Sequence, residues 1–157
     1  MKKILITQNL KKNKFNQLIH TLDDNWHDYF KNRKIILIPA FKKKNLSDFI
    51  SNIKPDGLIL SGGNDLYKFT KKTENKIRDN FETKILKEFM KKGLPILAVC
   101  RGFQFIANYF NQEIIRAKNH ISSNNKIKFY DEKLKKNIYV NSYHNFSIRN
   151  LSKEFEI

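Results

Sequence analysis

The only cysteine of this 157-residue chain, Cys100, stands where the sequence pattern changes from that of a strand to that of a helix. Ile96–Val99 is a short apolar run preceded by Pro95, which is typical of a buried strand. The apolar residues that follow recur at helical spacing: Phe103, Ile106, Ala107 and Phe110. Gly102 supplies the conformational freedom for a tight reversal between the two elements.

A thiol at such a turn is suited to nucleophilic chemistry. It is held clear of the sheet at a helix N-terminus, where peptide N–H groups favour an anion. This setting lowers a thiol pKa and can stabilise an oxyanion. We therefore expect Cys100 to be a reactive, partly exposed nucleophile with a depressed pKa. The competing interpretation is a buried core cysteine, and the position in the sequence alone supports either one.

A glycine loop is the second candidate part of the site. Ser61–Asp65 directly follows the predicted strand Leu58–Leu60 and contains Gly62 and Gly63. Adjacent glycines let a backbone approach a ligand closely, although composition alone favours an ordinary turn. Ligands of parallel sheets bind at the carboxyl ends of the strands. Because this loop and Cys100 follow consecutive predicted strands, both are expected at that edge.

Three segments resemble those of class I glutamine amidotransferase-like proteins. The A-V-C-R-G-F-Q segment around Cys100 resembles their G-x-C-x-G-x-Q elbow, with Ala98 where that family usually has glycine. Its C-R-G form is similar to the branch that contains gamma-glutamyl hydrolases and gamma-glutamyl-GABA hydrolases. Leu60–Leu66 and Val140–His144 resemble two further family segments, in the same order and at similar spacing. The resemblance covers nearly the whole chain.

The resemblance implies a mechanism and the residues for it. Cys100 would attack the carbonyl carbon of a gamma-glutamyl amide, and the N–H groups of Gly63 and Arg101 would form the oxyanion hole. The side chain of Arg101 could pair with a carboxylate or lie on the surface. An R-D-x-x-E pattern at Arg78–Glu82 is common in the hydrolase branch, although a solvent-facing helix would read the same way. The implied substrate-binding residues are Gln104, Asn141, Ser142, Tyr143 and His144.

Four histidines are candidates for proton transfer. His20 and His27 have no supporting context and are predicted on the surface. His120 falls in a predicted polar loop, Asn119–Asn125, from which it could line the pocket. His144 is assigned to substrate binding, with a role as a substitute general base as the alternative.

The general base of the family lies further downstream, in a W-H-P-E-like motif that this sequence does not contain. We therefore expect residues 1–157 to form a single class I glutamine amidotransferase-like domain that is truncated at its C-terminus. Without its base, such a domain would have little hydrolytic activity alone. Leu151–Ile157 resembles the beginning of a strand with nothing after it.

Composition argues against several classes of partner. The net charge is +16, but only five of the 31 basic residues are arginine, the residue that reads bases and grips phosphate bidentately. Specific nucleic-acid binding is therefore not expected, only weak attraction to polyanions.

No segment approaches the roughly 18 apolar residues of a membrane span, and Met1–Thr7 is too short for a signal peptide. We expect a cytoplasmic protein without a membrane partner. A single cysteine excludes an internal disulfide. The sequence has no His/Cys cluster with the spacing of metal ligands, so neither a metal nor an organic cofactor is expected.

Strands alternate with helices from the N-terminus, which predicts a flavodoxin-like, doubly wound α/β fold with a mostly parallel sheet and helices on both faces. The predicted strands are Lys3–Thr7, Lys34–Pro39, Leu58–Leu60, a central strand at Ile96–Val99, and Glu113–Arg116. A small antiparallel hairpin is expected near the C-terminus from Lys126–Tyr130 and Ile138–Tyr143. The predicted helices are a first one capped by Thr21, Asn45–Ile53, Thr73–Lys92 and the one after Cys100. Lys11–Asn16 is predicted to be a loop.

These observations predict a cysteine-nucleophile hydrolase of a gamma-glutamyl amide bond that works through a gamma-glutamyl thioester. The small-molecule substrate could be gamma-glutamyl-GABA, a gamma-glutamyl peptide or a polyglutamate. A gamma-glutamyl nucleotide amidate, used in surface-polysaccharide modification, is the first choice. The alternatives are an amidotransferase subunit that supplies ammonia to a partner, and an inactive relative that keeps the fold as a binding or structural domain.

Overall fold

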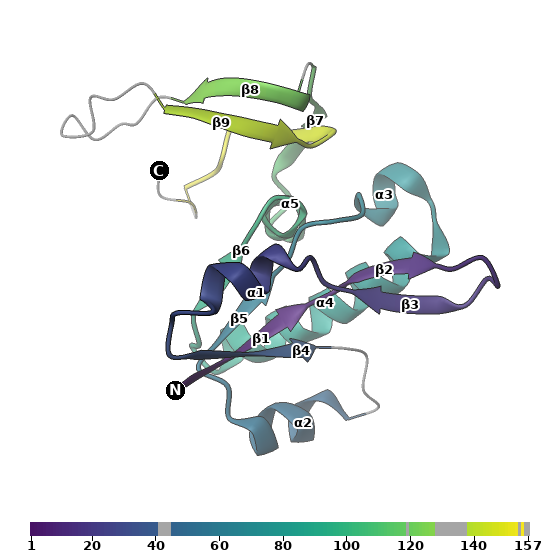
Figure 1. Ribbon diagram of the computed structural model, residues 1–157. Helices are drawn as coiled ribbons and strands as arrows, with labels where there is room; N and C mark the ends of the chain where they lie inside the picture. Colours follow the sequence, from purple (N-terminus) through teal and green to yellow (C-terminus); the bar gives the residue numbers. More distant parts are fainter. Residues whose placement is uncertain (41–44, 119, 128–137, 154, 156–157) are drawn as a thin grey trace.

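The computed structural model describes residues 1–40, 45–118, 120–127, 138–153 and 155 (Figure 1). Four parallel strands form its central sheet in the order β4-β1-β5-β6. Their bounds are Lys2–Thr7 for β1, Ile35–Ala40 for β4, Gly57–Leu60 for β5 and Ile96–Ala98 for β6. This sheet confirms the predicted flavodoxin-like α/β class.

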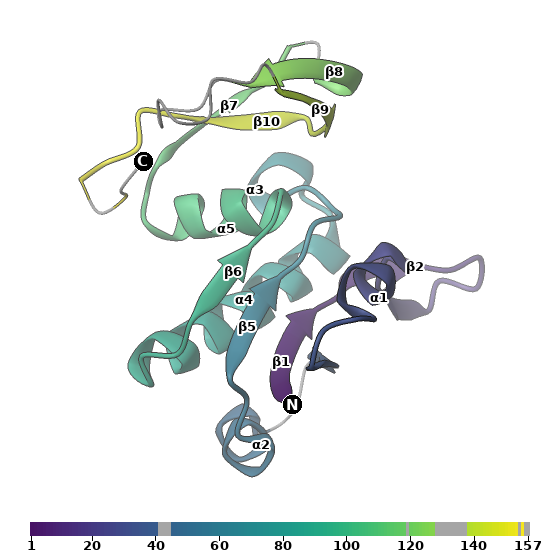
Figure 2. The same cartoon turned by 60° about the vertical axis from the view of Figure 1, so that its left-hand side comes forward.

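Helices follow the strands and lie on both sides of the sheet. They are α1 (Asn25–Phe30), α2 (Leu46–Ile53), α3 (Tyr67–Thr70), α4 (Thr73–Lys91) and α5 (Arg101–Tyr109). Figures 1 and 2 show α1 on the side of the sheet opposite to α4. None of the helices in the described part of the chain combines the length and the hydropathy needed to cross a bilayer.

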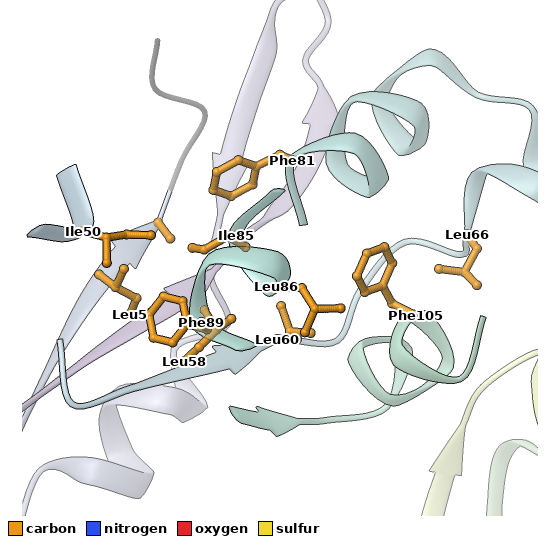
Figure 3. Close-up of a cluster of buried hydrophobic side chains, with 11 residues drawn as sticks. Leu5, Ile50, Leu58, Leu60, Leu66, Phe81, Ile85, Leu86, Phe89 and Phe105 are labelled. Atoms are coloured by element: carbon orange, nitrogen blue, oxygen red, sulfur yellow. The ribbon is translucent and has the colours of Figure 1, made fainter. Parts of the chain in front are cut away.

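The core lies on the face of the sheet that meets α2, α4 and α5 (Figure 3). Side chains alternate between the two faces of a strand, so Leu58 and Leu60 of β5 both point into this core. Leu5 of β1, Ala40 of β4 and Leu66 belong to the same cluster. Its helical members are Ile50, Phe81, Ile85, Leu86, Phe89 and Phe105. By the same alternation, Leu97 and Val99 belong to the opposite face, the one that carries α1.

Three antiparallel pairs surround the sheet. In the N-terminal part, β2 (Asn9–Lys12) pairs with β3 (Leu18–Thr21). Beyond α5, β7 (Glu113–Arg116) pairs with β10 (Phe146–Arg149), and β8 (Ile121–Ile127) pairs with β9 (Ile138–Tyr143). The β8–β9 pair confirms the predicted C-terminal hairpin.

The predicted loop at Lys11–Asn16 is confirmed for residues 13–16, which form the turn of the β2–β3 hairpin, but Lys11 and Lys12 belong to β2. The predicted helix cap at Thr21 is wrong, because Thr21 ends β3. The side chain of Asn13 accepts hydrogen bonds from the backbone N–H groups two and four residues further on, at 2.9 Å each. Asn16 adopts a positive φ of 61°, which asparagine tolerates. Polar side chains thus close a turn between two strands. Helix α1 begins only at Asn25.

The edge strands of the described sheet are β4 and β6. β6 pairs only with β5 among the described residues, so the prediction of a central strand at Ile96–Val99 is wrong in that respect. β4 forms the other edge, and Ile36 on it is 41% exposed. An edge strand accommodates Pro39, which cannot donate a hydrogen bond to the ladder.

The C-terminal predictions need three corrections. The predicted polar loop Asn119–Asn125 is mostly strand, since β8 already begins at Ile121. Strand β10 was not predicted. Leu151–Lys153 and Phe155 lie in no strand, and the ring of Phe155 instead meets Phe110 edge-on at 5.9 Å. The rest of that predicted strand, and residues 128–130 of another, lie outside the described residues.

Candidate active site

Cys100 occupies a strained backbone position between β6 and α5. It is the N-cap of α5, with φ 52° and ψ −110°, a conformation that non-glycine residues rarely adopt. Hydrogen bonds on either side fix it: Val99 N–H donates to the Leu60 carbonyl at 3.0 Å, and Gly102 N–H donates to the Val99 carbonyl at 2.9 Å. The predicted strand, sharp turn and helix are confirmed in that order.

Gly102 is required by the contact between α5 and β5. A Cβ at this position would lie 2.1 Å from the carbonyl oxygen of Leu60 and 2.7 Å from its carbonyl carbon. Only glycine lets the first turn of α5 approach the end of β5 this closely. The same contact holds Cys100 beside the glycine loop that follows β5.

The side chain of Cys100 is exposed, as predicted, but the predicted direction of its pKa is wrong. Desolvation of the sulfur by its surroundings raises the pKa of the Cys100 thiol. The backbone N–H of Arg101 lowers this pKa, the carboxylate of Asp65 raises it, and the guanidinium of Arg78 lowers it. The helix N-terminus therefore stabilises the thiolate, but by less than desolvation destabilises it.

Replacing Asp65 by asparagine is expected to lower the pKa of the Cys100 thiol, because a nearby negative charge that disfavours the thiolate is removed. The rate of alkylation by iodoacetamide, measured from about pH 6 to pH 10, should reach its midpoint at a lower pH than in the wild type. Asp24→Asn, an exposed change next to α1, should leave the profile in place. An unchanged or raised midpoint in Asp65→Asn would contradict the placement of Asp65 beside the thiol.

The glycine loop after β5 lies directly against Cys100. A Cβ on Gly62 would be 3.6 Å from the Cβ of Cys100. Gly63 has a φ of +115°, and a Cβ on it would be 2.7 Å from the side chain of Asn9. Within the described residues, the N–H of Gly63 is paired with no acceptor. The loop that lies against Cys100 therefore contains a backbone donor without an acceptor among the described residues, and its role in an oxyanion hole stays a prediction.

A buried ionic network underlies both the loop and the elbow. The R-D-x-x-E residues of α4 are not solvent-facing: Arg78 is 2% exposed and Glu82 is fully buried. The carboxylate of Glu82 accepts from Nε of Arg78 at 2.9 Å and also from Nη1 of Arg101. Arg101 donates in addition to Asp79. The side chain of Arg101 is therefore buried and paired with carboxylates, and does not lie on the surface.

Burial shifts the pKa values of this network. Desolvation lowers the pKa of Arg78 to about 10 and that of Arg101 to about 9. Desolvation also raises the pKa of Asp79, against the opposing effect of Arg101. Both arginine pKa values stay above neutral pH, so both guanidinium groups remain charged and keep their carboxylate partners.

Asn145, just after β9, contacts the glycine loop with its side chain. Nδ2 of Asn145 donates to the carboxylate of Asp65 at 3.1 Å. Of the predicted substrate residues on β9, Ser142 is buried, whereas Asn141 and Tyr143 are exposed. Asn145 was not singled out from the sequence, although it directly follows the family-like segment Val140–His144.

His144 is half-buried and lies beside a second histidine. The ring centroids of His120 and His144 are 4.8 Å apart, and the backbone N–H of His144 donates to the backbone carbonyl of His120 at 3.1 Å. Desolvation lowers the pKa of His144, and the His120 imidazole lowers it further. His20 and His27 are exposed, as predicted.

Gln104, predicted to face the substrate, is buried near the start of α5. Its Nε2 donates to the carbonyl of Phe146 at 2.8 Å, which ties α5 to β10. The ring of Phe146 stacks on Phe69 of α3 at 3.8 Å. Gln104 therefore helps to hold the β7–β10 pair over the helix that carries the thiol.

A cavity of about 630 Å³ opens beside the glycine loop, on the α1 side of the sheet. Gly62 and Gly63 line one end of it. Trp26 of α1 and Lys11 of β2 also line it, and sequence reasoning assigned no site role to either. Within the described residues, no group of three or more His, Cys, Asp or Glu side chains could hold a metal ion.

A parallel sheet with a strained cysteine at a strand-to-helix turn, and a glycine loop against it, is the arrangement expected of a class I glutamine amidotransferase-like protein. The chain belongs to the peptidase C26 family, whose sequence profile matches residues 30–157.

Two relatives of known name are similar to part of the chain. It is 38% identical over 97 residues to the gamma-glutamyl-CDP-amidate hydrolase of Campylobacter jejuni, a match that covers 62% of this chain and 46% of that protein. It is also 38% identical over 85 residues to one subunit of the glutamine-hydrolyzing GMP synthase of Pyrococcus furiosus, covering 54% of this chain and 40% of that one. The chain therefore spans less than half the length of either relative.

A glutamine amidotransferase of known structure from Thermotoga maritima shares the fold. It superimposes with a TM-score of 0.62 at 16% identity, over 94% of this chain and 62% of the other. At that identity the likeness concerns the fold alone.

Proposed function

We propose that this protein cleaves the amide bond of a small gamma-glutamyl compound, with Cys100 as the nucleophile. The observation that carries the proposal is the strained backbone of Cys100 at the N-terminus of α5, directly against the glycine loop. Strain of this kind persists only where the surroundings impose it, and it is concentrated at functional sites. Membership of the peptidase C26 family and the name of the C. jejuni relative support the same chemistry.

In the proposed reaction, the sulfur of Cys100 forms a bond to the gamma-carbonyl carbon, and the carbonyl electron pair moves onto oxygen. The N–H groups of Gly63 and Arg101 stabilise that oxyanion. When the carbonyl re-forms, the carbon–nitrogen bond breaks, and the departing nitrogen takes up the proton that the thiol lost. A gamma-glutamyl thioester remains. Water attacks the thioester, releases glutamate and restores the thiol.

The glutamyl end of the substrate carries an ammonium and a carboxylate, and residues of β9 and the turn after it are proposed to hold them. Side chains from this segment offer hydroxyl, amide and imidazole groups: Asn141, Ser142, Tyr143 and His144. Desolvation and the neighbouring His120 both lower the pKa of His144. Its imidazole is therefore neutral at physiological pH and offers one donor and one acceptor. The bond from Asn145 to Asp65 keeps this segment next to the glycine loop.

The leaving group is proposed to be a nucleotide amidate, because the C. jejuni relative is named as a hydrolase of gamma-glutamyl-CDP-amidate. A role in surface-polysaccharide modification is part of the same proposal. The cavity beside Gly63 supports this choice. A volume of about 630 Å³ lies within the range of ligand sites, the Trp26 ring can stack on a base, and Lys11 can meet a phosphate.

A panel of gamma-glutamyl amides tests the substrate class by the amine released from each. We expect the nucleotide amidate to be the preferred substrate and Trp26→Ala to raise its KM about tenfold or more, in line with the loss of one base–aromatic stack. The same variant should leave the KM of gamma-glutamyl-GABA unchanged, which serves as the internal control. Preference for gamma-glutamyl-GABA would overturn the nucleotide assignment. A chain whose thiol reacts with iodoacetamide but gains no gamma-glutamyl group from any amide would overturn the proposed chemistry itself.

A second candidate function rests on the similarity to the GMP synthase of P. furiosus. In that case the thioester chemistry is the same, and the ammonia released from glutamine passes to a synthetase partner. Glutaminase activity that appears only when such a partner is added would favour this role over the free-standing hydrolase.

A further inference from the structure

The side chain of Arg78 holds the glycine loop by four hydrogen bonds from its two Nη atoms. Nη2 donates to the Ser61 carbonyl at 2.8 Å and to the Ser61 hydroxyl at 3.2 Å. Nη1 donates to the Gly62 carbonyl at 3.0 Å and to the side-chain oxygen of Asn64 at 3.2 Å. The planar guanidinium, which is buried, therefore bonds to Ser61, Gly62 and Asn64 of the loop at once.

One of these bonds sets the direction of a candidate oxyanion donor. The carbonyl of Gly62 and the N–H of Gly63 belong to the same peptide unit, which is planar and trans. When Arg78 holds the Gly62 oxygen, the N–H of Gly63 must point the opposite way, away from the buried guanidinium. Among the described residues it is paired with no acceptor. A rotation of this peptide would lose the bond to Arg78 and turn the donor away.

The second candidate donor is fixed by the same network. The N–H of Arg101 belongs to the first residue of α5, whose own side chain is paired with Glu82 and Asp79. The carboxylate of Glu82 contacts both arginines, one oxygen each. The fully buried carboxylate of Glu82 thus links Arg78, which holds the Gly62–Gly63 peptide, to the side chain of Arg101, whose backbone N–H is the second donor.

We propose that Arg78 and Glu82 are positioning residues that fix the two oxyanion-hole donors relative to each other and to Cys100. This inference rests on the proposed function, since it assigns a role in the acylation step. Neither residue touches the reacting atoms. They act through the orientation of the Gly62–Gly63 peptide and of the first residue of α5.

Two reactions of the same thiol separate this role from a general effect on folding or thiol reactivity. Acylation by gamma-glutamyl p-nitroanilide passes through an oxyanion, whereas alkylation by iodoacetamide is a direct displacement at carbon that needs no oxyanion hole. Arg78→Lys keeps the positive charge but loses the fork that reaches Ser61 and Gly62 together. Glu82→Gln keeps the volume and provides a second variant. Lys84→Met, an exposed change on the same helix, is the matched control.

We expect Arg78→Lys and Glu82→Gln to slow p-nitroaniline release by roughly 10²–10³-fold, the effect of losing one oxyanion donor. Their alkylation rates, compared at equal thiolate fraction from pH profiles, should match the wild type, as should both rates in Lys84→Met. Equal losses in acylation and alkylation, or acylation at the wild-type rate, would overturn the positioning role alone. If neither variant folds, as judged by thermal unfolding, the network is structural and the inference is wrong. If the wild type is alkylated but not acylated, the proposed function fails and takes this inference with it.

Discussion

Gly102→Ala is expected to destabilise the protein by at least about 3 kcal/mol. Overpacking usually costs about 1–3 kcal/mol, and here the added atom meets rigid backbone, so the cost should lie at or above the top of that range. The new Cβ would lie 2.1 Å from the carbonyl oxygen of Leu60, which is backbone and cannot rotate away. Either α5 moves off β5 or the end of β5 shifts, and both movements separate Cys100 from the glycine loop. Urea unfolding followed by circular dichroism would measure the change in the free energy of unfolding.

Gly62→Ala is the matched control for this prediction. Its Cβ would meet Cys100 at 3.6 Å, an ordinary contact, so the free energy of unfolding should change by less than about 1 kcal/mol. If the two variants unfold at the same urea concentration, α5 does not approach β5 as described. The close contact between Gly102 and Leu60 would then not be what positions the elbow.

Cys100→Ser is expected to lower the release of amine from a gamma-glutamyl amide by roughly 10³-fold or more. A serine hydroxyl in this position is far less acidic than a thiol and has no adjacent base to activate it within the proposed mechanism. The fold should be retained, since the replaced side chain is exposed and similar in size. Thermal unfolding supplies that control. Retention of wild-type turnover in Cys100→Ser would show that another residue is the nucleophile.

The parts of the fold that bury apolar runs could be predicted from the sequence. Strand Gly57–Leu60, helix Leu46–Ile53 and helix Thr73–Lys91 all show the expected apolar pattern, and the structure places them within a few residues of the predictions. The change of pattern at Cys100 likewise locates the elbow, because a strand that turns at once into a helix leaves few geometries for the residue between them.

Other parts depend on tertiary contacts that no local pattern records. Strand Ile121–Ile127 is largely polar and is paired along its length with β9. The charges of Arg78 and Glu82 would suit a solvent-facing helix, and they are buried only because Arg101 and the carbonyl groups of the glycine loop meet them. The direction of the Cys100 pKa shift depends on how much solvent the neighbouring segments remove, which the helix N-terminus alone does not predict.

If Cys100 forms a gamma-glutamyl thioester, mass spectrometry of the acid-quenched protein will detect it as an added mass. The wild-type chain, mixed with a gamma-glutamyl amide and quenched at short times, should gain the mass of one gamma-glutamyl group. Peptide mapping should place that group on Cys100, and hydroxylamine should remove it, as expected for a thioester. The adduct should be absent from Cys100→Ser under the same conditions. A wild-type protein whose thiol is alkylated by iodoacetamide but which gains no gamma-glutamyl group, or gains it at another residue, would contradict the account.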